Sequence, residues 1–84
     1  MAKKVTKKKK EKVDPYLKAI GDKIVALRNA KGISQIELAR RLNTFNNTIR
    51  RIENGTTNPT INTLRDIAAV LDIAVFDLIK ITKD

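Results

Sequence analysis

Residues 34–55 read S-Q-I-E-L-A-R-R-L-N-T-F-N-N-T-I-R-R-I-E-N-G, and this stretch decides the fold. Ser34 and Glu37 have the spacing of a capping box, in which each side chain accepts a hydrogen bond from the other residue's backbone N–H. A helix is therefore expected from this cap to about Leu42. Three residues then make a short connection, and a second helix is expected over residues 46–54. Two helices joined by a three-residue turn match the helix-turn-helix plan.

The second of these helices is predicted to have two unlike faces. At about 100° per residue, Ile49 and Ile52 fall on one side of the helix and face the core. Five polar residues share the opposite arc: Asn46, Asn47, Arg50, Arg51 and Asn54. Arginine can bind guanine through two hydrogen bonds, and asparagine can bind adenine in the same way. An ordinary solvated face is the competing interpretation, although such a face would usually include Glu, Lys or Ser.

The sequence on both sides adds three more helices. Asp14 and Pro15 are typical of a helix start, and Gly32 is typical of a left-handed helix end. A fourth helix is expected from the cap at Thr60, because apolar residues then recur at three- and four-residue steps. A last helix is expected over residues 75–81. No segment has a convincing strand pattern, so the sequence predicts an all-α fold of five helices.

Composition narrows the class of function. The chain has 84 residues, no cysteine, no histidine and a net charge of +9. These features predict one domain, no disulfide, no thiolate metal site, no cofactor and no catalytic constellation, so an enzyme is disfavoured. A strongly basic chain favours nucleic acid as its partner. No apolar run is long enough to span a membrane and no secretory signal is recognisable, so we expect a cytoplasmic, nucleoid-associated protein.

The first 13 residues are predicted to form a disordered basic tail, followed by the helix-turn-helix domain over residues 14–84. Residues 1–14 hold seven lysines and two acidic residues, a net charge of +5. Like charges at this density repel one another in a compact state. The tail could add only solubility, contact DNA phosphates, or wrap the duplex as an ordered arm. We favour phosphate contacts, which would strengthen binding to all DNA and steepen its salt dependence.

The segment from 34 to 55 resembles the lambda-repressor-like, Cro-type family of helix-turn-helix regulators, also called the XRE family. Residues 20–28, I-G-D-K-I-V-A-L-R, and residues 58–73, N-P-T-I-N-T-L-R-D-I-A-A-V-L-D-I, match the same pattern. The resemblance covers about residues 15–80. It implies a five-helix lambda-repressor-like DNA-binding domain that binds an inverted-repeat operator as a dimer. In that arrangement helix 46–54 lies in the major groove of double-stranded DNA.

The resemblance also implies roles for individual residues. Base contacts are implied for Phe45, Asn46, Asn47, Arg50 and Arg51. Phosphate contacts are implied for Gln35, Asn54, Thr56, Thr57 and Asn58. A structural ion pair between Arg28 and Glu53 is implied, and it would fix the recognition helix against the scaffold. No metal ligand is implied.

Thr44 and Phe45 depart from the family pattern, because the first position is usually apolar and the second is usually a capping Ser or Thr. Thr44 could cap the helix instead and move its start by one residue. Phe45 would then either fold into the core, which is the interpretation we favour, or contact a thymine methyl group.

Four classes of function follow in order of preference. The first is a sequence-specific transcriptional regulator, most simply a repressor. The second is an antitoxin or a restriction controller, which would use the same DNA face and, as an antitoxin, would also bind a toxin or another protein. A protein-interaction module and an enzyme come after these. Val75, Ile79 and Ile81 form either the interface of a homodimer or ordinary core packing.

Overall fold

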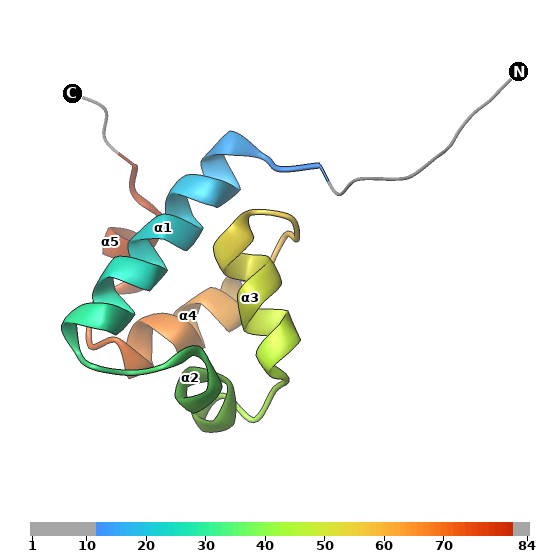
Figure 1. The fold of residues 1–84 in the computed structure, drawn as a ribbon. Helices are drawn as coiled ribbons and strands as arrows, with labels where there is room; N and C mark the ends of the chain where they lie inside the picture. Colours follow the sequence, from blue (N-terminus) through green and yellow to red (C-terminus); the bar gives the residue numbers. More distant parts are fainter. Residues whose placement is uncertain (1–11, 82–84) are drawn as a thin grey trace, which may run out of the picture.

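The computed structural model describes residues 12–81, and within them the chain forms five helices and no strand (Figure 1). The helices are α1 (Pro15–Ala30), α2 (Gln35–Arg41), α3 (Asn46–Asn54), α4 (Ile61–Val70) and α5 (Val75–Ile79). The predicted all-α, five-helix fold is thus confirmed. The tail predicted to be disordered is residues 1–13, and residues 1–11 of it lie outside the described part. Residues 82–84 also lie outside it.

Three of the helices begin at the capping residues that the sequence indicates. The Asp14 carboxylate accepts hydrogen bonds from the N–H groups of Tyr16 and Leu17. The Ser34 hydroxyl accepts one from the N–H of Glu37, and the Thr60 hydroxyl caps α4 in the same way. The second hydrogen bond of the expected capping box, from the N–H of Ser34 to the Glu37 carboxylate, is not formed. The carboxylate binds two arginines on its own helix instead.

The helix ends agree with the sequence-based expectation at two glycines and differ from it at three other places. Gly32 and Gly55 have φ of 71° and 76°, as expected for left-handed stops. Asn43 and Asp72 also adopt positive φ, 58° and 63°, and they end α2 and α4 without a glycine. Helix α5 ends at Ile79, two residues before the predicted end, because the backbone becomes extended at the next residue.

The core lies between α1, α3 and α4, and α2 and α5 close its two ends (Figure 1). Its fully buried members include Ile24, Leu38, Ile49, Ile67, Leu71 and Leu78. The backbones of α1 and α3 approach each other closely, and a Cβ on Gly21 would lie 2.3 Å from the carbonyl oxygen of Glu53. Only a residue without a side chain lets the two helices meet at this distance. Helix α3 is therefore set directly on α1.

The C-terminal segment is held on α1 by polar contacts. The Lys23 ammonium donates hydrogen bonds of 2.6 Å and 2.9 Å to the carbonyls of Asp77 and Lys80. The Tyr16 hydroxyl donates to the carbonyl of Ile79. These hydrogen bonds satisfy carbonyls that the end of α5 leaves without helical partners.

Candidate nucleic-acid interface

Helix α3 presents one polar face to solvent above an apolar face in the core. Ile49 and Ile52 are 1% and 4% exposed, so both are inward as the sequence indicates. The five polar residues of the opposite arc are all exposed: Asn46, Asn47, Arg50, Arg51 and Asn54. The structure therefore brings four of the five predicted base-contacting side chains together on one helix face.

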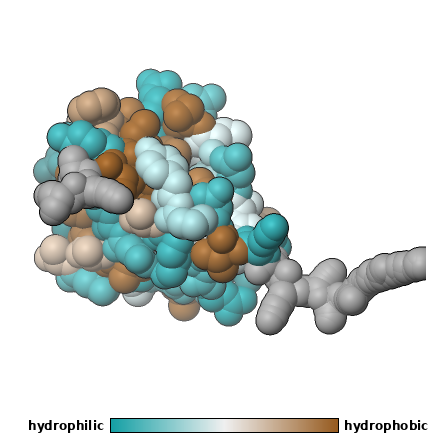
Figure 2. Space-filling view, turned by 90° about the horizontal axis from the view of Figure 1, so that it is seen from above, coloured by the Kyte–Doolittle hydropathy of each residue, from teal (hydrophilic) through white to brown (hydrophobic). Residues whose placement is uncertain are grey.

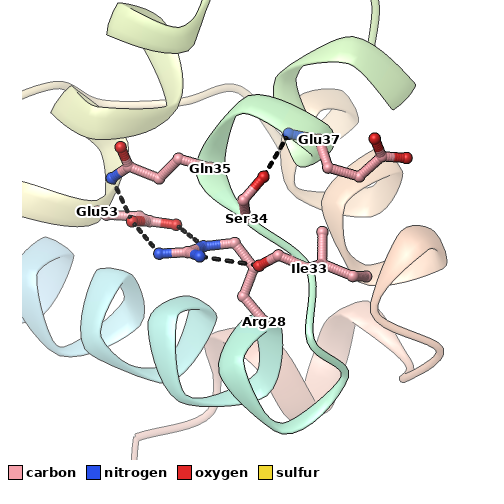
Figure 3. A network of polar contacts seen from close by, with 6 residues as sticks. All are labelled: Arg28, Ile33, Ser34, Gln35, Glu37 and Glu53. Atoms are coloured by element: carbon pink, nitrogen blue, oxygen red, sulfur yellow. Dashed lines mark hydrogen bonds and ion pairs between the residues drawn. The ribbon is translucent and has the colours of Figure 1, made fainter.

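A buried ion pair fixes α3 to the rest of the domain (Figure 3). The guanidinium of Arg28 donates two hydrogen bonds to the Glu53 carboxylate, 2.7 Å from Nε and 3.1 Å from Nη2. Its third donor, Nη1, binds the carbonyl of Ile33 at 2.9 Å. Both charged side chains are buried, and the two-pronged geometry satisfies the carboxylate on both oxygens. The pair predicted from the family resemblance is present in the structure.

Gln35 joins this network from the first turn of α2. Its side-chain amide donates a 2.8 Å hydrogen bond to Glu53, so one carboxylate holds α1, α2 and α3 together (Figure 3). Gln35 also lines an open hollow of about 540 Å³ with Ile36 and Asn46. The predicted phosphate ligand thus lies beside the start of α3.

Two side chains on the exposed face contact each other. The Arg50 guanidinium donates a 2.5 Å hydrogen bond to the Oδ1 atom of Asn47. This hydrogen bond uses one of the two lone pairs of the asparagine oxygen and neither of its two amide hydrogens. The paired side chains therefore present mainly donors, which suits acceptor-rich base edges.

The loop after α3 continues the same surface. A hollow of about 250 Å³ is lined by Asn47, Arg51 and Thr57, together with a further threonine of α3. Thr56 is folded back, because its N–H and hydroxyl both bind the carbonyl of Arg51. Thr56 and Thr57 are half-buried, whereas Asn58 is exposed. The predicted phosphate-contacting loop therefore adjoins the predicted base-contacting face, with Thr57 nearest to it.

The structure decides between the alternatives for Thr44 and Phe45. Helix α3 starts at Asn46 with Phe45 in the capping position, and no side chain caps it. Thr44 is half-buried and does not cap the helix. Phe45 is 79% exposed, so the favoured prediction that it folds into the core is wrong. Thr44, the residue before it, lines a hollow beside Ile49 and Ile52 instead, and the extended backbone at Phe45 carries the ring outward. A missing cap costs about 1 kcal/mol of stability.

On the surface of α2, the Glu37 carboxylate forms ion pairs with two arginines of the same helix. Hydrogen bonds from Arg41 and Arg40 hold the pKa of the Glu37 carboxyl below its ordinary value. Because the folded-state pKa is lowered, the stabilisation is present at neutral pH and is lost as the pH falls through that pKa. The same carboxylate also neutralises part of the positive charge on α2.

Three residues of this region were not singled out from the sequence. Gly21 looked like an ordinary helix residue, although a glycine inside a helical pattern is a signal of close packing. Ile36 is 66% exposed on the hollow beside α3. Lys23 anchors the C-terminal segment, and no local pattern indicates such a long-range hydrogen bond.

Residues 12–81 show neither a membrane span nor a metal site. None of the helices there combines the length and apolar composition needed to cross a membrane. The same residues contain no cluster of three or more Asp, Glu, His or Cys side chains placed to hold a metal ion.

Comparison with known proteins places the chain. The family model described as Helix-turn-helix matches residues 24–78, more than half of the chain. The restriction-modification controller protein C.AhdI from Aeromonas hydrophila has a similar structure, with 29% sequence identity and a TM-score of 0.74. That alignment covers 77% of this chain and 98% of C.AhdI. No curated protein sequence gives a significant match.

Two structures of the clp gene regulator ClgR from Corynebacterium glutamicum share the fold, with TM-scores of 0.72 and 0.74. They are 22% and 21% identical to this chain, and the alignments cover 82% and 83% of it. The covered shares of the two ClgR chains are 71% and 90%. The family match confirms the resemblance seen in the sequence. The chain therefore belongs to the XRE family of helix-turn-helix proteins, and it is a DNA-binding transcriptional regulator.

Proposed function

We propose that this protein is a dimeric repressor that reads an inverted-repeat operator with α3 in the major groove. The observation that carries the proposal is the exposed polar face of α3 over its buried isoleucines, Ile49 and Ile52. Helices of this kind enter the major groove at their N-terminal end, while the preceding helix crosses the backbone. The buried Arg28–Glu53 pair supports the proposal, because it gives the reading helix a fixed orientation.

The proposed DNA-binding residues divide into two groups. Base contacts come from the exposed residues Phe45, Asn46, Asn47, Arg50 and Arg51. Phosphate contacts come from Gln35, Asn54, Thr56, Thr57 and Asn58, which flank that face on two sides. The lysine-rich tail, residues 1–13, adds phosphate contacts without sequence preference, and residues 14–84 form the DNA-binding domain.

The proposed homodimer uses the side of the molecule formed by α1, α4 and α5. Val75, Ile79 and Ile81 are half-buried against the monomer's own core, so part of their surface is already used. Three large apolar side chains on the same side are more exposed than these: Tyr16, Ile61 and Phe76. An open groove of about 430 Å³ runs between Tyr16, Ile61 and Ile79. The surface seen in Figure 2 carries separate apolar patches among hydrophilic ones.

Charge supports the same choice of interface. Residues 59–84 hold three basic and four acidic residues, whereas residues 15–58 hold eight basic and three acidic ones. Two copies that meet through α4 and α5 therefore keep their basic surfaces apart and both available for DNA. A protein of this kind works in the cytoplasm, bound to the nucleoid.

Control of restriction-modification genes is the second candidate. It is favoured by the similarity to C.AhdI, of which 98% is covered by the alignment. The DNA face and the dimer would be the same, and only the regulated genes would differ. No observation favours the antitoxin role, which would need a protein partner as well.

Selection of bound sites from random duplexes tests the proposal, followed by titration at several salt concentrations. We expect a palindromic site with half-sites about one helical turn apart. Sedimentation at high micromolar protein concentration, with and without DNA, then measures the oligomeric state. Binding without any sequence preference would contradict the reading function, and a monomer under all conditions would contradict the dimer.

A further inference from the structure

Phe45 is the most exposed of the large apolar side chains in the described part of the protein. It is 79% exposed, against 63% for Phe76 and 66% for Ile36. It lies immediately before α3, next to the exposed amide side chains of Asn46 and Asn47. An exposed aromatic ring beside these polar side chains needs a physical explanation.

The local geometry turns the ring away from the protein. Thr44 is half-buried and lines a hollow of about 220 Å³ together with Ile49 and Ile52, so the residue before Phe45 faces inward. Phe45 itself has an extended backbone, with φ of −93° and ψ of 146°. In an extended chain successive side chains point to opposite sides, and the ring therefore points outward.

We propose that Phe45 recognises the C5-methyl group of a pyrimidine, in thymine or in 5-methylcytosine. The inference rests on the proposed function, because it places α3 in the major groove. The C5-methyl group of thymine is the one apolar group that the base pairs present there. A phenyl ring offers no conventional hydrogen bond, so it cannot discriminate between donors and acceptors on base edges. Burial of a methyl group against the ring is the favourable interaction left to it.

Ile36 supports the same role for this edge of α3. It lies on the hollow that also includes Asn46, the residue after Phe45, so a second exposed apolar side chain borders the start of α3. Asn46 therefore follows Phe45 in the chain and shares the hollow with Ile36.

Recognition of a methyl group makes the protein sensitive to cytosine methylation. A cytosine and a 5-methylcytosine present the same donors and acceptors in the major groove and differ only in the methyl group. If Phe45 reads that group, methylation of a cytosine at its position strengthens binding. The affinity of the regulator would then respond to cytosine methylation of its site.

The test starts from the site selected by the full-length chain from random duplexes. Each thymine in one half-site and its symmetry mate are replaced together by deoxyuridine, which removes only the methyl groups. For the unchanged protein, one position should weaken binding by about fourfold per half-site, the factor that corresponds to ~0.8 kcal/mol for each buried methyl group. Phe45→Ala should bind the thymine and deoxyuridine duplexes equally well. Phe45→Leu, which keeps an apolar side chain, should retain part of the difference.

Phe76→Ala is the matched control, because it removes the other exposed phenyl ring, on α5. It should keep the thymine-to-deoxyuridine ratio, even if a weakened dimer lowers its affinity for both duplexes. A second arm compares cytosine with 5-methylcytosine at the sensitive position. The unchanged protein should favour the methylated duplex by a similar factor, and Phe45→Ala should not.

Two results would overturn the inference while leaving the proposed function intact. One is a selected site in which no thymine methyl affects binding. The other is a Phe45→Ala variant that keeps the full ratio. If the protein selects no sequence at all, both the inference and the proposed function fail, so the two failures are distinguishable. Thermal unfolding of each variant confirms that it is folded, as expected for an exposed side chain.

Discussion

The backbone N–H of Asp14 donates a 3.1 Å hydrogen bond to the carbonyl of Gly55. This hydrogen bond ties the residue that caps α1 to the residue that ends α3. The same corner is tightly packed, because a Cβ on Gly55 would lie 2.7 Å from the backbone of Lys18. The chain that precedes Asp14 therefore joins the domain beside the loop proposed to bind phosphate.

This position leads to a prediction for the lysine-rich tail. Deletion of residues 1–12 should weaken binding to operator and random DNA alike, because the lysines of the tail are proposed to bind phosphates, which every sequence shares. The slope of log affinity against log salt should fall by about one for each phosphate that the shortened chain no longer binds. Titrations at several salt concentrations measure both effects. Unchanged affinity at low salt would show that the tail does not bind DNA.

Arg51 is predicted to read a base. Arg51→Ala should cost about 1–3 kcal/mol on the selected operator and relax the preference at one base pair. Arg65→Ala is the control, because it removes an exposed arginine on α4 and changes the net charge equally. Equal reductions in affinity for operator and random DNA would mean that Arg51 binds phosphate instead.

The hydrogen bond between Arg50 and Asn47 predicts a preference for guanine. An asparagine that pairs with adenine must accept a hydrogen bond through its side-chain oxygen, and the Arg50 guanidinium bound to that oxygen competes with the adenine amino group. Arg50→Ala should therefore shift the preferred base opposite Asn47 from guanine toward adenine. Repeating the site selection with this variant measures the shift. In Arg65→Ala the removed arginine binds an asparagine on α4, and the selected site should stay the same.

The buried ion pair should matter for orientation more than for net stability. Arg28→Met alone leaves the Glu53 carboxylate buried without its main partner and should cost about 3–5 kcal/mol of unfolding free energy. The double variant Arg28→Met, Glu53→Leu should recover most of this stability in urea unfolding. Its specific DNA binding should remain weaker than that of the unchanged protein. Full recovery of binding would show that the pair does not orient α3.

Gly21→Ala tests the close approach of α1 to α3. The added methyl group would overlap the carbonyl of Glu53, so α3 must shift, at a cost of about 1–3 kcal/mol. Operator binding should fall as well. Gly32→Ala is the control, because its Cβ would meet nothing within 4 Å and only backbone strain is expected there. Equal operator affinity of the two folded variants would rule out the orienting role of Gly21.

The sequence alone determined the features that depend on near neighbours in the chain. Capping residues at positions 14, 34 and 60 marked helix starts, since a side chain bonds to N–H groups two or three residues ahead. The three-residue spacing of Ile49 and Ile52 indicated which face of α3 is buried. The ordered motifs over residues 15–80 indicated the family.

Only the tertiary structure decided the features that depend on space between elements. Phe45 could have entered the core by its chemistry, and it is exposed because the turn before α3 directs Thr44, and not Phe45, toward the hollow beside Ile49 and Ile52. The carbonyls at the end of α5 are bound by Lys23, which is more than fifty residues away in the chain. Gly21 acquires its importance from the backbone of α3. Packing and long-range hydrogen bonds join residues far apart in sequence, and no local pattern records them.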